Sequence, residues 1–431
     1  MQHTISKISD TEQTLQIILA ADEYSDAYKQ EFDEARNNIQ IKGFRRGHAP
    51  AGLVKKVAGP SVEATVAEKM ASRYFGELAE QEIVKPVNRA EIIDFNFGDN
   101  QLTIELGYEV HPEFELADMS SYSFVKARYV IEESDIDKEI QHMLSAQGTL
   151  VSVDEPAGEN DTVVGDVWKL DANNEPDEAH KTSNHHFSLQ YLPKENPFRV
   201  ALIGKKAGET AEVATTAASD DEEVSRFRIV ISEIKRLELP ELTDELVSEV
   251  TDQKFSTIAD FRVDIRSKLE KHFTQTAEDE LLEAISEKLI EENPVPAPKS
   301  VIASFTNMLF ENAKQQTGGQ FPKHFDEAQF RETLHPNALK HAQWMIITRK
   351  IADTQQLAIS DEEIKSHLEK QTEKLSSDEQ KQQMLDSFNS REVREYVAEI
   401  VFKEKLYTYL KANVTITEED KPISAITEEQ E

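Results

Sequence analysis

The chain has 431 residues, enough for about two to four domains. Its 82 acidic residues outnumber its 48 basic ones and give a formal charge of -34, which argues against general binding of nucleic acid. It has no cysteine, which excludes disulfides and thiolate metal sites. No apolar run is long enough for a membrane helix, and the N-terminus does not resemble a signal peptide. We therefore expect a cytoplasmic protein without membrane contact.

Residues 1–112 show a mixed α and β pattern. Apolar residues alternate with polar ones from Leu102 to Val110 and again from Leu15 to Leu19, as in half-buried strands. A helix is expected over residues 22–40. In a second helix, apolar residues recur every four positions and so share one face: Val62, Val66, Met70, Tyr74 and Leu78. This pattern predicts a small sheet covered by a helix–loop–helix.

The rest of the chain predicts an α+β multidomain protein. Residues 113–149 are expected to form a linker and a helix capped by Ser134. This helix would be the first helix of a helical body. Residues 150–238 combine short β-like runs with turn-forming segments and predict a small β-rich domain. Residues 239–414 carry helical apolar stripes, broken by the prolines at 294–298. Residues 415–431 are polar and acidic, which predicts a disordered tail.

One segment departs from the acidic average. Residues 35–62 contain no Asp or Glu but six basic residues, and GFRRGHAP lies at their centre. Its glycines and proline favour a tight turn that exposes Phe44 beside Arg45 and Arg46. Aromatic and arginine side chains dominate binding interfaces, although a basic loop can also be plain solvated surface.

GFRRGHAP is similar to the GFRxGxxP signature of the trigger factor family, with YEVHPEFEL, LPELTDEL and NPVPAPKSVIASFTNMLF as further landmarks along nearly the whole chain. The resemblance implies an N-terminal domain that binds the large ribosomal subunit near the exit tunnel, an inserted FKBP-like prolyl isomerase domain and a helical cradle for unfolded nascent polypeptides. It implies that the docking residues are Gly43, Phe44, Arg45, Arg46, Gly47 and Pro50.

The helical cradle needs accessible apolar surface and no catalytic group. Met and aromatic side chains adapt to varied partners. The candidates for contact with clients are therefore Phe305, Met308, Phe310, Trp344 and Met345. The alternative for each of them is an ordinary place in the helical core.

The resemblance implies an aromatic pocket in residues 150–238, with Phe187, Phe198 and Phe227 as the matching aromatics. Other catalytic residues stay unassigned, and these three could equally be core. Glu195 and Arg199 are expected to place charge at the pocket rim. The segment before Phe227 is too short and acidic for the family's flap. These departures predict weak isomerase activity.

Two other functions remain open at this stage. The chain could act mainly as a prolyl isomerase, or as a ribosome or RNA assembly factor that uses the basic loop. His180, His185 and His186 lie together, but several histidines in a turn are usually polar surface, so no metal is expected. No phosphate-binding motif is present, so we expect no cofactor. The sequence leaves open whether the free chain forms a homodimer.

Overall fold

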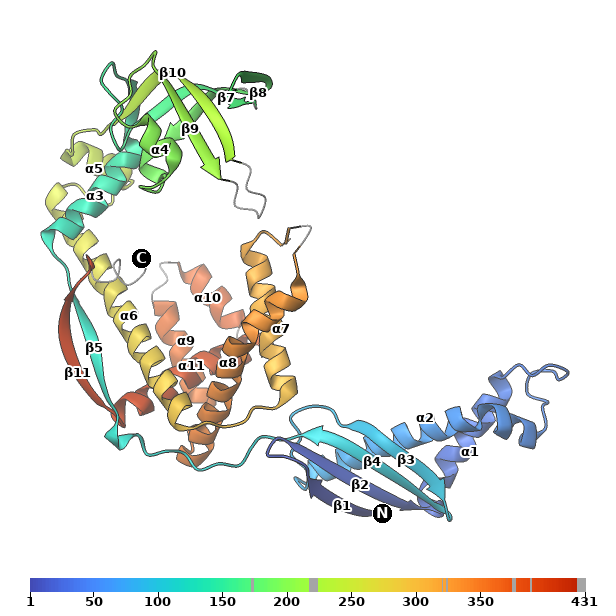
Figure 1. Cartoon of the computed structure of the whole chain (residues 1–431). Helices are drawn as coiled ribbons and strands as arrows, with labels where there is room; N and C mark the ends of the chain where they lie inside the picture. Colours follow the sequence, from blue (N-terminus) through green and yellow to red (C-terminus); the bar gives the residue numbers. More distant parts are fainter. Residues whose placement is uncertain are drawn as a thin grey trace. The chain divides into compact units, whose positions relative to one another are not determined.

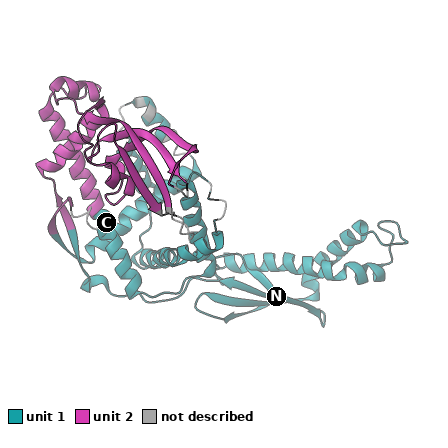
Figure 2. Cartoon of the chain, turned by 45° about the horizontal axis from the view of Figure 1, so that its top comes forward, with its two compact units in different colours: residues 1–126, 278–418 teal, residues 127–277, 419–431 magenta. Residues whose placement is uncertain are grey.

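The computed structural model (Figure 1) describes residues 1–171, 174–216, 224–319, 321–322, 325–373, 377–387 and 390–424. The chain divides into two compact units (Figure 2). One unit contains residues 1–126 and 278–418, and the other contains residues 127–277 and 419–431. In the described part, no helix is both long enough and apolar enough to cross a membrane.

The first unit begins with an antiparallel sheet of strand order β1-β2-β4-β3. The strands are β1 Gln2–Lys7, β2 Glu12–Ala20, β3 Glu91–Gly98 and β4 Gln101–Glu109. Two helices accompany them, α1 Ala21–Asn38 and α2 Ala51–Glu80 (Figure 1). The alternating apolar residues of β2 and β4 are buried against the predicted face of α2, so this part of the sequence prediction is confirmed.

The same unit continues with helices. These are the later part of α6 Ile258–Glu292, then α7 Lys299–Gln316, α8 Glu327–Gln355, α9 Asp361–Glu373, α10 Asp378–Ser387 and α11 Arg391–Ala412. The prolines at 294–298 separate α6 from α7, as predicted. The apolar stripe of α6 at Leu281, Ile285 and Leu289 is buried in a core that it shares with residues of α8 and α11.

The second unit contains a five-stranded sheet, as the β-rich pattern predicted. Its strands are β6 Thr149–Ser152, β7 Thr162–Leu170, β8 Pro176–Ser188, β9 Thr210–Thr216 and β10 Val224–Glu238. The long β10 pairs with β7 along one edge and with β9 and β6 along the other. Three helices complete the unit with the start of α6: α3 Glu133–Gln147, α4 Pro197–Leu202 and α5 Asp244–Val250.

Helix α3 differs from the sequence prediction in its start. Glu132 is the N-cap, and its backbone N–H donates to the Asp135 carboxylate at 3.0 Å, whereas Ser134 lies inside the first turn. Ile136, Ile140 and Leu144 of α3 pack in one core with Val247 of α5 and Phe261 of α6. The helices before and after the inserted domain therefore share one core.

The expectation of a disordered tail is wrong for its first part. Residues Thr415–Pro422 form β11, which pairs with β5 Ser123–Val130. The Thr415 N–H donates to the Tyr122 carbonyl at 2.9 Å, and Arg128 forms an ion pair with Asp420. The acidic segment is thus ordered because a basic strand provides both backbone partners and opposite charge.

Candidate functional site

The loop between α1 and α2 is shaped by two glycines. Gly43 has φ +94° and Gly47 has φ +79°, a backbone conformation that side chains disfavour. The Phe44 N–H donates to the Ile41 carbonyl at 3.1 Å, and the His48 N–H donates to the Arg45 carbonyl at 3.0 Å. These two turns hold the middle of the loop outward.

The C-terminal end of the loop is fixed to the two helices. Ala49 is only 2% exposed and belongs to a small core with Val54 and Ala58. Pro50 is the N-cap residue of α2, and its carbonyl accepts the N–H groups of Leu53 and Val54. The packing of a small residue therefore anchors the loop without using the residues at its tip.

The tip presents a large apolar ring beside two positive charges. Phe44 is 43% exposed, and Arg45 and Arg46 are exposed as well. Within the described residues, neither guanidinium forms an ion pair. Because nothing in the described chain uses these side chains, their groups are available to a partner that offers an apolar surface and acidic or phosphate oxygens.

A second site lies in the inserted domain, where the three predicted phenylalanines meet. The ring centroids are 5.5 Å apart for Phe187 and Phe198 and 5.6 Å apart for Phe198 and Phe227. The rings line a cavity of about 290 Å³ together with Val167, Thr182, His185 and Leu192. The geometry expected for an aromatic pocket is thus present, and residues from β7, β8, α4 and β10 build it.

Helix α4 places Phe198 in this pocket. The Asn196 side chain caps the helix by accepting the N–H groups of Phe198 at 2.9 Å and Arg199 at 3.4 Å, and Pro197 occupies the first turn. Asn196 and Pro197 therefore form a helix start. The resemblance to the family's loop does not predict this role.

The expectation that Glu195 and Arg199 charge the pocket rim is wrong, because neither side chain lines the pocket. Arg199 is buried; its guanidinium donates to the Leu192 carbonyl at 2.8 Å and to the Glu159 carboxylate at 3.2 Å. A buried charge requires such partners. The segment expected to lack a flap lies mostly at residues 217–223, outside the described residues.

The polar residues of the pocket are Thr182 and His185, which the sequence prediction does not assign to it. The His185 ring lies 4.5 Å from that of Phe187 in a T-shaped contact. Alternate side chains of a strand share one face. The position of His185 two residues before Phe187 could therefore have indicated that it lines the pocket. The same pattern could not have indicated Thr182, because it lies three residues before His185.

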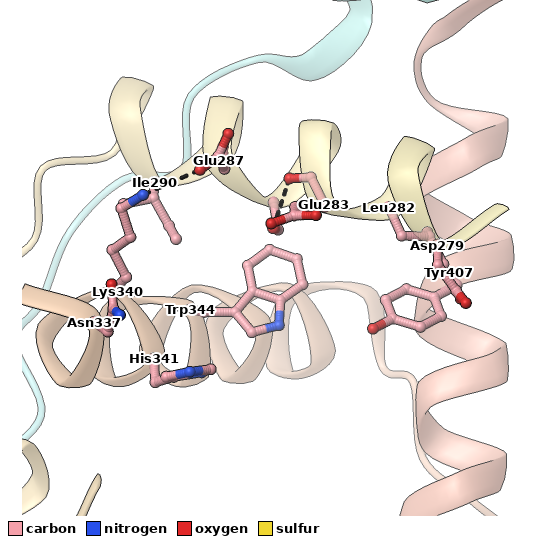
Figure 3. A pocket seen from close by; sticks show the side chains of 11 residues that line it. Asp279, Leu282, Glu283, Glu287, Ile290, Asn337, Lys340, His341, Trp344 and Tyr407 are labelled. Carbon is pink, nitrogen blue, oxygen red and sulfur yellow. Dashed lines mark hydrogen bonds and ion pairs between the residues drawn. The ribbon is translucent and has the colours of Figure 1, made fainter. Parts of the chain in front are cut away.

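Trp344, one of the predicted client residues, lies in a groove of about 530 Å³ between α6, α8 and α11 (Figure 3). Its indole extends from α8 toward α6, with Leu282 and Ile290 on the opposite helix and Tyr407 on α11. Burial raises the pKa of Tyr407, and the charge of Asp279 adds to that effect. The groove combines aromatic rings with an acidic wall.

The other predicted client residues differ in how far their side chains are exposed. Met308 is 44% exposed, and half-buried Phe305 stacks on His341 with centroids 5.7 Å apart. Phe310 is only 4% exposed, under Arg331 and among other phenylalanines, so its ring is not accessible as predicted. Met345 is half-buried and packs against the helical core. Phe310 is therefore a core residue.

Three family models match most of the chain. Residues 1–143 match the family model "Bacterial trigger factor protein (TF)", and residues 257–412 match its C-terminus. Residues 150–251 match "Probable trigger factor, FKBP-like domain". The matched segments therefore define a chaperone class in which an FKBP-like domain is inserted between N- and C-terminal parts.

Similar relatives sharpen this result. The chain is 54% identical to the trigger factor of Chlorobium phaeobacteroides and 56% identical to that of Pelodictyon phaeoclathratiforme, in each case over 98% of this chain and 99% of the relative. A solved structure titled "Promiscuous Substrate Recognition in Folding and Assembly Activities of the Trigger Factor Chaperone" matches 96% of this chain and all of that one. With 16% identity and a TM-score of 0.48, that similarity is too low to bear on the fold.

The chain belongs to the trigger factor family. It is therefore a ribosome-associated chaperone with an FKBP-like domain, and this function is favoured over those of a free-standing prolyl isomerase or an RNA assembly factor.

Proposed function

We propose that the chain docks on the large ribosomal subunit near the tunnel exit through Phe44, Arg45 and Arg46. The observation that carries this proposal is an exposed phenylalanine beside two arginines without ion pairs in the described chain, on a loop anchored by a buried alanine. Arginine pairs bidentately with carboxylate or phosphate, and the ring supplies apolar area. Gly43, Gly47 and Pro50 shape the loop and need not touch the ribosome.

Co-sedimentation of the full chain with separated ribosomal subunits tests this proposal. We expect the chain to pellet with large subunits and to remain in the supernatant with small subunits. Moderate salt should weaken the complex only partly, because an apolar contact accompanies the charges. Equal pelleting with both subunits, or steep loss with salt on naked ribosomal RNA, would instead support general RNA binding.

The second part of the proposal is that the helical body holds unfolded nascent segments without ATP. Trp344, Phe305 and Met308 offer apolar surface on neighbouring helices, dispersed among charged residues. Patches of this kind bind apolar segments weakly without causing self-association. The chain should suppress aggregation of a denatured client equally with and without ATP. Dependence on ATP would contradict the proposal.

The third part concerns the aromatic pocket, which we propose takes up prolyl segments and isomerises them slowly. Three phenylalanine rings and two aliphatic residues provide an apolar cavity. Its mouth is open at exposed Thr182 and His185, which admits water to a site that works by desolvating the prolyl amide. Rates on proline tetrapeptides should be at least about tenfold below those of relatives with the family's intact loop, a difference of about 1.4 kcal/mol in barrier.

Two finer points complete the proposal. The chain would act in the cytoplasm, where ribosomes translate, as its family membership supports. When free of ribosomes it would form a homodimer. The outer edge of β1, where Ile5 is exposed and exposed Ile8 follows the strand, is a candidate contact. Sedimentation velocity at increasing concentration tests this, and a constant monomeric value would refute it.

A further inference from the structure

Strand β8 carries an irregularity beside the aromatic pocket. His185 pairs with Gly165 of β7, and Thr182 pairs with Val167. Two residues of β8 therefore lie opposite the single residue Asp166, which is the definition of a β-bulge. One of them, Asn184, has φ +51°, a left-handed conformation that is uncommon for a residue other than glycine.

The bulge decides which side chains reach the pocket. In a regular strand, residues three positions apart point to opposite faces. Thr182 and His185 are three positions apart, yet both line the pocket together with Phe187. The extra residue at Ser183 and Asn184 changes the alternation, so both polar groups face the same cavity. Bulges often re-aim side chains next to functional sites.

Side-chain contacts hold the bulge in place. The Asn184 N–H donates to the Asp166 carboxylate at 3.0 Å, and Lys181 forms an ion pair with the same carboxylate at 2.8 Å. The Lys181 ammonium also lies 4.6 Å from the Trp168 ring centroid. Hydrogen bonding to Lys181 and to Asn184 keeps the pKa of Asp166 below its ordinary value. Asp166 therefore stays ionised at neutral pH and can stabilise the strained residue.

We infer that His185 orients the bound segment by donating an imidazole N–H to the carbonyl oxygen of the proline itself, which lies outside the rotating amide. This inference rests on the proposed function of the pocket as a prolyl site. In a largely apolar pocket, the few polar groups set how the ligand lies. The T-shaped contact with Phe187 places the imidazole beside the rings that receive the proline. His185 is thus a positioning residue, and the ligand class is an extended peptide with an accessible Xaa-Pro bond.

Titration of the full-length protein with a proline tetrapeptide, followed by steady-state isomerase kinetics, tests this inference. His185→Phe keeps a ring but removes the donor, and should raise KM about tenfold while kcat changes less than about threefold. That pattern is expected when one hydrogen bond holds substrate and transition state equally. His185→Gln retains an N–H donor and should recover most of the affinity. His186→Phe is the matched control on the next residue, which does not line the pocket, and should leave KM unchanged.

A second variant tests the bulge itself. Asn184→Val places a β-branched residue where φ is positive, which the bulge cannot tolerate, and should weaken peptide binding as much as His185→Phe. Phe198→Ala distinguishes the role of His185 from the function of the pocket as a whole. If it abolishes binding while His185→Phe matches the wild type, only the role of His185 is overturned. If the wild-type protein binds no proline peptide, the pocket's proposed function fails and this inference fails with it.

Discussion

The docking loop and the aromatic pocket are built in opposite ways. The loop is one continuous segment whose side chains point outward from a small anchor, and its tip residues stabilise nothing in the described fold. The pocket is assembled from β7, β8, α4 and β10, and two of its rings, those of Phe187 and Phe198, also pack in the core of the domain. A contiguous exposed site can therefore change its binding without changing stability, whereas an assembled site couples the two.

Removing the tip should have the largest effect. Changing Phe44, Arg45 and Arg46 together to Ala should weaken ribosome binding at least about hundredfold, because all the proposed contacts are lost. The free energy of unfolding should stay within about 0.5 kcal/mol, since the three side chains are exposed. Co-sedimentation and urea denaturation measure the two quantities.

A charge-matched control sharpens that result. Lys55 and Lys56 are exposed on α2, outside the tip. Changing both to Ala removes two positive charges, the same number as the tip variant removes. It should reduce ribosome binding by less than about threefold. A loss as large as that of the tip variant would mean that the basic segment acts through its net charge.

The pocket should behave differently under substitution. Phe198→Ala removes a half-buried ring that packs against the domain core, so it should lower the stability of the inserted domain by about 2–3 kcal/mol and also weaken proline-peptide binding at least about tenfold. Thermal unfolding and peptide titration of the full-length protein provide the two values. Loss of binding at unchanged stability would break the contrast with the loop.

The same contrast explains what the sequence could predict. GFRRGHAP is local, so its exposure follows from an eight-residue pattern, and the buried stripe of α2 follows from its period. The burial of Arg199 depends on Glu159, forty residues away in the chain, and Thr182 enters the pocket only through the bulge at Asn184. The strand at Thr415–Pro422 forms because β5 lies beside it. Partners that are remote in sequence decided each of these features.

Removing the inserted domain tests whether holding of clients is independent of the pocket. Thr149 and Glu238 are paired neighbours in β6 and β10, so a short Gly-Ser linker can replace residues 149–238 without separating the flanks. The shortened protein should bind no proline peptide but retain at least about half of the wild-type suppression of client aggregation. A folded protein that protects no client would refute the assignment of holding to the helical body.

Backbone strain in the loop should give a smaller effect. Gly43 has φ +94° with open space around it, so Gly43→Ala should cost about 1 kcal/mol through the backbone alone and weaken ribosome binding about fivefold. Gly52→Ala is the matched control, because that glycine is in α2 with equally open space and the change should be neutral or slightly stabilising. Equal losses in the two variants would show that loop shape is not important.

The smallest expected effect concerns acid stability of the helical body. Hydrogen bonds from Lys126 and Lys411 lower the pKa of Glu278 below its ordinary value of 4.5. Its contribution, about 1 kcal/mol for charge-assisted bonds at a partly exposed site, is therefore complete above pH 4.5 and lost as the pH falls through the lowered pKa. Glu278→Gln should destabilise the protein at pH 7 but not near pH ~2. An equal loss at both pH values would contradict this origin.

The most direct test of ribosome docking is site-specific photocrosslinking. A photoreactive phenylalanine analogue at position 44 should crosslink to a component of the large subunit beside the tunnel exit when translating ribosomes are added. The same analogue at position 55, on the exposed surface of α2, should give little or no such product. No crosslink from position 44 on ribosomes that bind the chain, or an equal yield from both positions, would contradict docking through the tip of the loop.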